Sequence, residues 1–181
     1  MKPRTQTSMM ESKSFDPEGN HLSQEGATPL IIPRHKIRVR VMQAIYAHLV
    51  SETPAEEVFA HLLEEMHEAA QAEAPHNADF LRELYFGVIQ MMPELRSLVE
   101  KHLRGWTWER LFLVDKCILL CGAYELTHFP DIPLRVTLNE WIEIAKAYGT
   151  PRSPGFVNGL LDAIRRTLSE DPNSLVSQKS P

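Results

Sequence analysis

The sequence predicts an all-α fold, a single compact domain of about seven helices. Two observations carry this prediction. Apolar residues recur at spacings of three and four in almost every segment between residues 33 and 169, which is the period of a helix with one buried face. No segment alternates between apolar and polar residues with period two, the pattern of a half-buried strand. At 181 residues the chain is long enough for one domain with a substantial core.

The first four helices are each predicted from an apolar stripe and a start or stop signal. The first is expected over residues 33–49. The second begins at Thr53-Pro54, where the threonine can cap the helix and the proline suits its first position. The third begins after Asn77, and Pro93 starts the fourth because a proline cannot comfortably continue the third.

The last three helices include the expected centre of the fold. Leu111–Leu126 is the most apolar helix and is therefore expected to be the central one. Gly122 within it costs about 1 kcal/mol of helix propensity relative to alanine, so we expect a neighbouring helix to approach closely there. The final two helices are Arg135–Tyr148 and Ser153–Leu168, the second with a serine cap followed by a first-turn proline. Asn158-Gly159 is expected to allow another close approach of two helices.

Both ends of the chain lack apolar periodicity. We expect a disordered N-terminal tail at residues 1–32, the helical domain at 33–169 and a disordered C-terminal tail at 170–181. No run of about 18 apolar residues occurs, and the first residues lack the apolar core of a secretory signal. We therefore expect a cytoplasmic protein with no membrane partner.

No arrangement of residues points to catalysis. The eight histidines are scattered, no Cys/His spacing matches a zinc site, and no glycine-rich loop of the nucleotide-binding kind is present. Cys117 and Cys121 lie four residues apart on an apolar helix, where we expect buried thiols and no disulfide between them. The sequence thus predicts no cofactor, no metal and no enzymatic activity.

Positive charge is concentrated in one window of an acidic protein. The formal net charge is −5, yet Gly26–Ser51 contains no acidic residue and carries +4, so the rest carries −9, since −5 minus +4 is −9. A basic element on an acidic body predicts a localised docking site for an anionic partner. The alternative is a solvated basic start of a helix. The basic residues of the window are Arg34, Lys36, Arg38 and Arg40.

Aromatic and amide side chains supply candidate contacts to nucleic-acid bases. Gln43 and Tyr46 lie one turn apart on the first helix, where Tyr46 can stack on a base and Gln43 can read a base edge. Phe156 lies in the first turn of the last helix, whose free N–H groups suit a phosphate. The structural alternative for both aromatic rings is ordinary core packing, and we expect Trp106 and Trp108 to cover the core.

Five motifs in order along the helical domain resemble those of the NusB family. The most specific lie between Pro133 and Asp162, where Asn139-Glu140 stand inside one helix and Phe156-Val157-Asn158-Gly159 open the next. We expect Asn139 and Glu140 to bond an adjacent loop or helix end. The other matches run from Arg38 to Tyr46, from Phe80 to Val88, and from Trp106 through Arg110 and Asp115-Lys116 to Leu126.

This resemblance implies a transcription antitermination factor of bacteria. Family members bind a boxA-type single-stranded RNA element together with the ribosomal protein NusE. The resulting complex modifies RNA polymerase so that it reads through terminators, chiefly during ribosomal RNA synthesis. The resemblance thus implies RNA contacts for the basic window, Gln43, Tyr46 and Phe156, and also for Arg152, which stands in a loop that is often acidic in the family.

An alternative of another class stays open, namely a helical protein–protein scaffold that kept this fold and lost RNA binding. His35, Ile37 and Val39 interrupt the arginine run that is usual in the family. Leu120 stands where the family often has an arginine.

Overall fold

The computed structural model describes residues 33–70 and 77–170, and within these the chain is all helical, as predicted. The proposed disordered tails lie outside the described residues, apart from Glu170. Most helix boundaries agree with the predicted ones within two residues, because prolines and the apolar period mark them locally. The helices are α1 Arg34–Ser51, α2 Ala55–Ala70, α3 Ala78–Gln90, α4 Met92–His102, α5 Leu113–His128, α6 Leu134–Tyr148 and α7 Ser153–Glu170, with a short 3-10 helix η1 at Trp108–Arg110.

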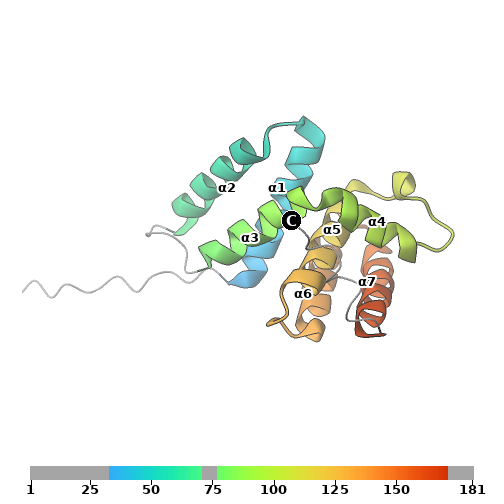
Figure 1. Cartoon of the computed structure of the whole chain (residues 1–181). Helices are drawn as coiled ribbons and strands as arrows, with labels where there is room; N and C mark the ends of the chain where they lie inside the picture. The colour runs from blue at the N-terminus through green and yellow to red at the C-terminus, as the bar shows by residue number, and fades with distance from the viewer. Residues whose placement is uncertain (1–32, 71–76, 171–181) are drawn as a thin grey trace, which may run out of the picture.

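Helix α5 is the centre of the fold, as its uniform apolarity predicts. It packs against α1, α3, α4, α6 and α7, and every residue from Cys117 to Leu126 is buried. Figure 1 shows α4, α6 and α7 gathered around α5 on one side of the view, with α1, α2 and α3 on the other. Cys117 and Cys121 are buried free thiols, as expected, and burial raises the pKa of Cys117 to about 12.

Glycines in two of the helices have opposite surroundings. A Cβ on Gly122 would lie 2.8 Å from Cδ1 of Leu161, so the missing side chain lets α5 and α7 approach closely, as predicted. A Cβ on Gly159 would meet nothing within 4 Å. The expected close approach at Asn158-Gly159 is therefore wrong, because this part of α7 faces open space.

A buried carboxylate joins three helices. Glu125 of α5 is fully buried and accepts hydrogen bonds from Nε and Nη2 of Arg38, each at 2.8 Å. It also accepts from Oγ1 of Thr137 at 2.9 Å and from Nε1 of Trp141 at 3.2 Å, both on α6. A buried ion pair is tolerated only when such additional bonds offset the desolvation of its charges. The cluster therefore fixes α1 and α6 against α5.

The start of α1 is also tied to α6 nearer the surface. Oε2 of Glu140 lies 2.8 Å from Nδ1 of His35 and 3.6 Å from Nη1 of Arg38. The structural role expected of Glu140 is confirmed, since it bonds the first turn of an adjacent helix. These contacts fix the orientation of the basic N-terminal end of α1 relative to α6.

Helix α2 is more peripheral and packs against α1 and α3. Phe59 stacks on Tyr85 with ring centroids 5.4 Å apart, and the Tyr85 hydroxyl donates to the carbonyl of Ala55 at 3.0 Å. These contacts leave a groove between α2 and the second half of α1.

Candidate nucleic-acid interface

The four basic residues of the first helix do not share one environment. Arg34, Lys36 and Arg40 are exposed, whereas Arg38 is only 2% exposed. The guanidinium of Arg38 is occupied by Glu125, so the expectation that all four residues face a ligand is wrong for Arg38. Turning Arg38 outward would leave the carboxylate of Glu125 buried without its cation. The free-energy cost of this would exceed the gain from a contact between Arg38 and a phosphate.

Arg34, Lys36 and Arg40 are the exposed cations in the first two turns of α1, and we call them together the α1 basic edge. Lys36 and Arg40, four residues apart, share one face of the helix, and Arg34 extends from the opposite side of the first turn. The guanidinium of Arg34 lies 4.9 Å from the centroid of the Phe80 ring, a cation–π distance that steadies the side chain while leaving it accessible. Arg40 contacts Glu65 at 3.3 Å, and both side chains are substantially exposed. Exposed ion pairs contribute little to stability, so Arg40 can leave Glu65 for a phosphate at small cost.

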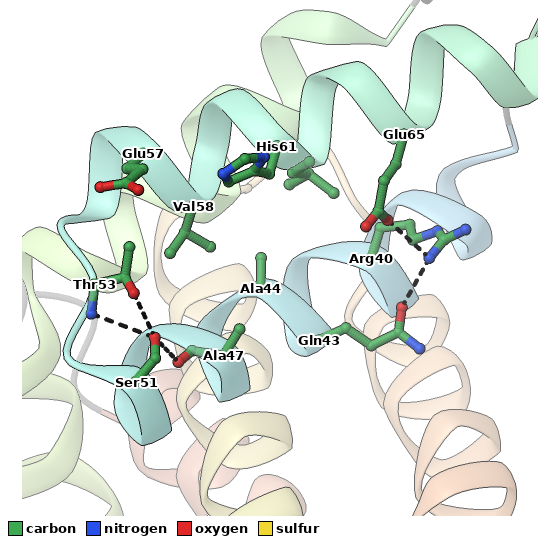
Figure 2. A pocket seen from close by; sticks show the side chains of 11 residues that line it. Arg40, Gln43, Ala44, Ala47, Ser51, Thr53, Glu57, Val58, His61 and Glu65 are labelled. Carbon is green, nitrogen blue, oxygen red and sulfur yellow. Dashed lines mark hydrogen bonds and ion pairs between the residues drawn. The ribbon is translucent and has the colours of Figure 1, made fainter.

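Gln43 lies one turn after Arg40 on the same side of α1, and both side chains line the groove against α2. The groove has a volume of about 530 Å³, with Ala44, Val58 and Leu62 among its lining residues. Figure 2 shows Gln43 and Glu65 both pointing toward the guanidinium of Arg40, and Gln43 Oε1 accepts from Arg40 at 3.3 Å. The structure therefore couples Gln43 to Arg40 and does not bring it to the other predicted base contacts.

Tyr46 borders a second hollow, of about 290 Å³, formed by α1, the start of α5 and the end of α6. Tyr46, Phe112 and Tyr148 all line it, and all three are exposed. Contiguous exposed aromatic side chains are uncommon on a surface without a partner. We call these three residues the aromatic face.

Arg152 and Phe156 lie together in a third hollow, of about 270 Å³. Trp106, Arg110 and Phe112 line the same hollow, and sequence reasoning assigned them no ligand. A signal for them was present in the sequence, since cationic and aromatic residues occupy every second position from 104 to 112. We call this cavity the Trp106 hollow.

The two tryptophans of this segment, Trp106 and Trp108, lie in different environments. Trp108 is 9% exposed, so its expected place over the core is confirmed. Trp106 is 50% exposed, and the same expectation is wrong for it. The guanidinium of Arg110 lies 5.0 Å from the centroid of a Trp106 ring, so one side of this indole is already covered by a cation.

Asp115 lines both the hollow beside Tyr46 and the Trp106 hollow. It is 5% exposed, and its Oδ1 is the one buried side-chain oxygen or nitrogen without a hydrogen-bond partner in the described part of the chain. Burial raises the pKa of Asp115, and a hydrogen bond from Ser153 offsets part of that rise. An orphaned buried acceptor calls for an explanation, and a donor supplied by a ligand is one.

Two further features of the described residues concern metal ions and membranes. Within residues 33–70 and 77–170 there is no group of three or more histidine, cysteine, aspartate or glutamate side chains placed to hold a metal ion. None of the helices in those ranges is both long enough and apolar enough to cross a membrane.

Comparison with known proteins gives one consistent family. A sequence model described as the NusB family matches residues 35–166. The chain is 34% identical over 137 residues to the transcription antitermination protein NusB of Bacillus pumilus, covering 76% of this chain and 98% of that relative.

Solved structures give the same result for the fold. The chain is similar to NusB of T. maritima with a TM-score of 0.68 and 32% identity, over 76% of this chain and 93% of the other. It also matches a structure of the antitermination factors NusB and NusE in complex with dsRNA, with a TM-score of 0.65 and 22% identity, over 74% of this chain and 96% of the other. At 22% identity, the second match is evidence for the fold alone.

Proposed function

The chain belongs to the NusB family, and on that premise we propose that it is an antitermination factor that binds boxA-type single-stranded RNA together with the ribosomal protein NusE. Its relatives are named transcription antitermination proteins, and a protein of the same fold forms a complex with NusE and RNA. The assembly would act on RNA polymerase during ribosomal RNA synthesis. Its mechanism is affinity and positioning, with no bond made or broken.

The observation that carries the RNA proposal is the α1 basic edge. Three exposed cations lie within seven residues at the start of one helix, on a chain with a net charge of −5. The first turn of α1 contains no acidic residue, and Pro33 supplies no side-chain cap. The free N–H groups and the positive end of the helix dipole therefore add to the attraction for phosphate.

Base contacts are proposed for the residues that stand apart from that edge. Tyr46, Arg152 and Phe156 border the two hollows that flank the start of α5, where aromatic rings and a cation are accessible. Gln43 is also proposed to contact the RNA, next to Arg40, from which it accepts a hydrogen bond. RNA that follows these residues would run from the start of α1 toward the start of α7.

The protein partner is proposed to dock at the Tyr148 side of the aromatic face, which leaves Tyr46 to the RNA. Phe112 is 65% exposed, and Tyr46 and Tyr148 flank the same hollow. Interfaces between proteins are enriched in such rings. Because Phe112 lines both hollows, partner and RNA would lie side by side, and each would help to hold the other.

The scaffold alternative keeps one supporting observation, the burial of Arg38, which leaves three cations on α1 available instead of four. The other argument for a scaffold, the leucine at position 120, becomes weaker. Leu120 is fully buried, so a leucine at that position removes no cation from the surface.

The test is a salt titration of boxA-type RNA binding. Replacing Arg34, Lys36 and Arg40 together by alanine should weaken binding and flatten the log–log salt slope by about 2.1, at about 0.7 per phosphate contact on a single strand. A matched control removes three exposed cations elsewhere, Lys101, Arg104 and Arg166, and should leave the slope unchanged. Equal slopes for wild type and the α1 variant would favour the scaffold.

Binding of the partner supplies a second test. If RNA and NusE dock side by side, saturating NusE should tighten RNA binding, and RNA must tighten NusE binding by the same factor. A coupling of about 1–3 kcal/mol is expected. Identical RNA affinity with and without NusE, after correction for RNA bound by NusE alone, would contradict the joint complex.

A further inference from the structure

The Trp106 hollow has walls from two separate stretches of the chain, the connection between α4 and α5 and the start of α7. Trp106 comes from the loop after α4, Phe112 directly precedes α5, and Phe156 lies in the first turn of α7. The accessible surface of the lining is mainly apolar, and a few polar groups stand among the rings. This is the usual composition of a site for a small planar group. Phe156 thus meets Trp106 and Phe112 in one cavity although it lies far along the chain from both.

Two of these rings are more exposed than the packing of the core requires. Trp106 is 50% exposed and Phe112 is 65% exposed, whereas Trp108, two residues from Trp106, is buried. Large rings left in water at one place indicate a surface that is covered by a partner. An aromatic wall accepts any nucleobase, because every base has a flat face to stack.

The charges at the hollow favour a nucleic acid over an apolar partner. Arg110 and Arg152 line the cavity and are exposed, and neither forms an ion pair with any of the described residues. Guanidinium groups suit phosphate, both by charge and by their paired N–H donors. A base in the cavity would place its own phosphates beside these two side chains.

Asp115 supplies an acceptor inside the same cavity. Its Oδ1 is buried and has no donor within the described residues. An exocyclic amino group of adenine, cytosine or guanine is a donor of the kind that a carboxylate accepts. Since Oδ1 is covered in the free protein, a base reaches it only after a lining side chain moves, and Phe112 is the most exposed ring there.

We propose that the Trp106 hollow binds one unstacked base of the RNA, against Trp106, Phe112 and Phe156, with flanking phosphates on Arg110 and Arg152. Asp115 accepts a hydrogen bond from the exocyclic amino group of that base and so favours adenine, cytosine or guanine over uracil, whose only base donor is the ring N3–H. This inference rests on the proposed RNA binding and adds Trp106, Arg110, Phe112 and Asp115 to its residues. It also predicts that one nucleotide of the strand is read at this place.

The experiment is a set of titrations with a short boxA-type single-stranded RNA in which each nucleotide in turn is made abasic. In the wild-type protein the abasic change at the nucleotide that enters the hollow should lower the affinity by about 5- to 150-fold, which is base stacking of about 1–3 kcal/mol converted at 1.4 kcal/mol per tenfold. In Trp106→Ala the intact RNA should bind more weakly, and the abasic change at that position should have little further effect. Such non-additivity identifies the ring and the base as partners.

Leu134→Ala is the control, since Leu134 is an exposed large apolar side chain that lines none of the three hollows. It should preserve the full effect of the abasic position. Phe112→Ala serves as a second variant should Trp106→Ala fail to fold, because Phe112 is the more exposed of the two rings. In Asp115→Ala the preference for an amino-bearing base over uracil at the same position should disappear.

Three results would overturn the proposal. Abasic effects that Trp106→Ala and Phe112→Ala leave unchanged would exclude a base from the hollow. Loss of NusE binding in these variants, with RNA binding intact, would make the hollow a protein-docking site. RNA binding that is absent in the wild-type protein would instead defeat the proposed function itself, which the salt titration detects separately.

Discussion

Arg38 and Arg40 stand two residues apart on α1, and the structure uses them in opposite ways. Two residues turn a helix by about 200°, so side chains at this spacing face opposite sides. Arg38 points inward and holds Glu125 with two bonds of 2.8 Å, while Arg40 is exposed beside Glu65. A count of charges along the sequence cannot separate these roles. One arginine is part of the core, and the other is free to meet a ligand.

The same contrast between core and surface recurs for two other residue types. Trp108 is buried and Trp106 is half exposed, and Gly87 is tightly covered whereas Gly159 faces open space. Each pair offers a matched experiment. The core member should control stability, and the surface member should leave stability unchanged or raise it.

The largest effect is expected for Arg38→Ala. It leaves Glu125 buried without its cation, and breaking a buried pair in this way costs about 3–5 kcal/mol. Urea unfolding followed by circular dichroism measures the loss, and Arg40→Ala is the control, expected within about 0.5 kcal/mol of wild type. Similar stability of the two variants would remove the distinction.

A double variant sharpens that result. Arg38→Met with Glu125→Gln removes both charges; the amide oxygen still accepts from Nε1 of Trp141, and the new amide N–H can donate to the hydroxyl of Thr137. The double variant should be more stable than Arg38→Ala, because no uncompensated charge remains in the core. A double variant as unstable as the single one would mean that the charge of Glu125 is not the source of the cost.

The next effect in size is expected for Gly87→Ala. A Cβ there would collide with the ring of Tyr124, which is buried and cannot withdraw easily. Overpacking of this kind typically costs about 1–3 kcal/mol. The measurement is again the free energy of unfolding in urea. A variant as stable as wild type would show that α3 and α5 can separate without loss.

Gly159→Ala should have the opposite sign. Gly159 lies within α7, and a Cβ there meets nothing within 4 Å. Alanine should therefore stabilise the protein by up to about 1 kcal/mol through helix propensity alone. Thermal unfolding at fixed pH is sufficient to detect the gain. Destabilisation would indicate a constraint on the backbone of α7 that its surroundings do not show.

Much of the fold was predictable because its signals are local. Prolines, caps and the apolar period mark the ends of helices, and the expected end of the first helix at residue 49 lies two residues before the observed Ser51. The start of the fifth was expected at Leu111 and is observed at Leu113, because the chain first forms the short helix η1. The uniform apolarity of that helix correctly predicted its central position.

The candidate site was only partly predictable, because its residues are brought together by tertiary contacts. Arg38 is paired with a carboxylate 87 residues away, which no local pattern shows. One signal was present, since Arg38 precedes the buried residues Met42 and Ile45 by four and seven positions and so shares their face. The Trp106 hollow likewise depends on the meeting of two distant stretches, residues 106–115 and 150–156, and sequence reasoning found only Arg152 and Phe156 in it.

The smallest expected effect tests whether Asp115 is held for a ligand at the expense of stability. Its pKa in the folded protein is raised, so the folded state binds the proton more tightly than the unfolded state does. Stability from this group is therefore fully present below the ordinary aspartate pKa of about 3.9 and is lost as pH rises through the raised value. Asp115→Asn removes this loss, and it should be more stable than wild type at neutral pH, with the difference vanishing toward acidic pH.

Asp162→Asn is the control of opposite sign. Its hydrogen bond from Arg165 lowers the pKa of Asp162, so the stability contributed by that group is present above about pH 3.9 and is lost as pH falls through the lowered value. Asp162→Asn should thus be slightly less stable than wild type at neutral pH. The measurement is the difference in unfolding free energy between each variant and wild type across acidic to neutral pH. If Asp115→Asn gains stability at neutral pH and Asp115→Ala loses the preference for an amino-bearing base over uracil, the orphaned carboxylate is maintained for binding. An Asp115→Asn variant that is destabilised at neutral pH would make Asp115 an ordinary structural residue.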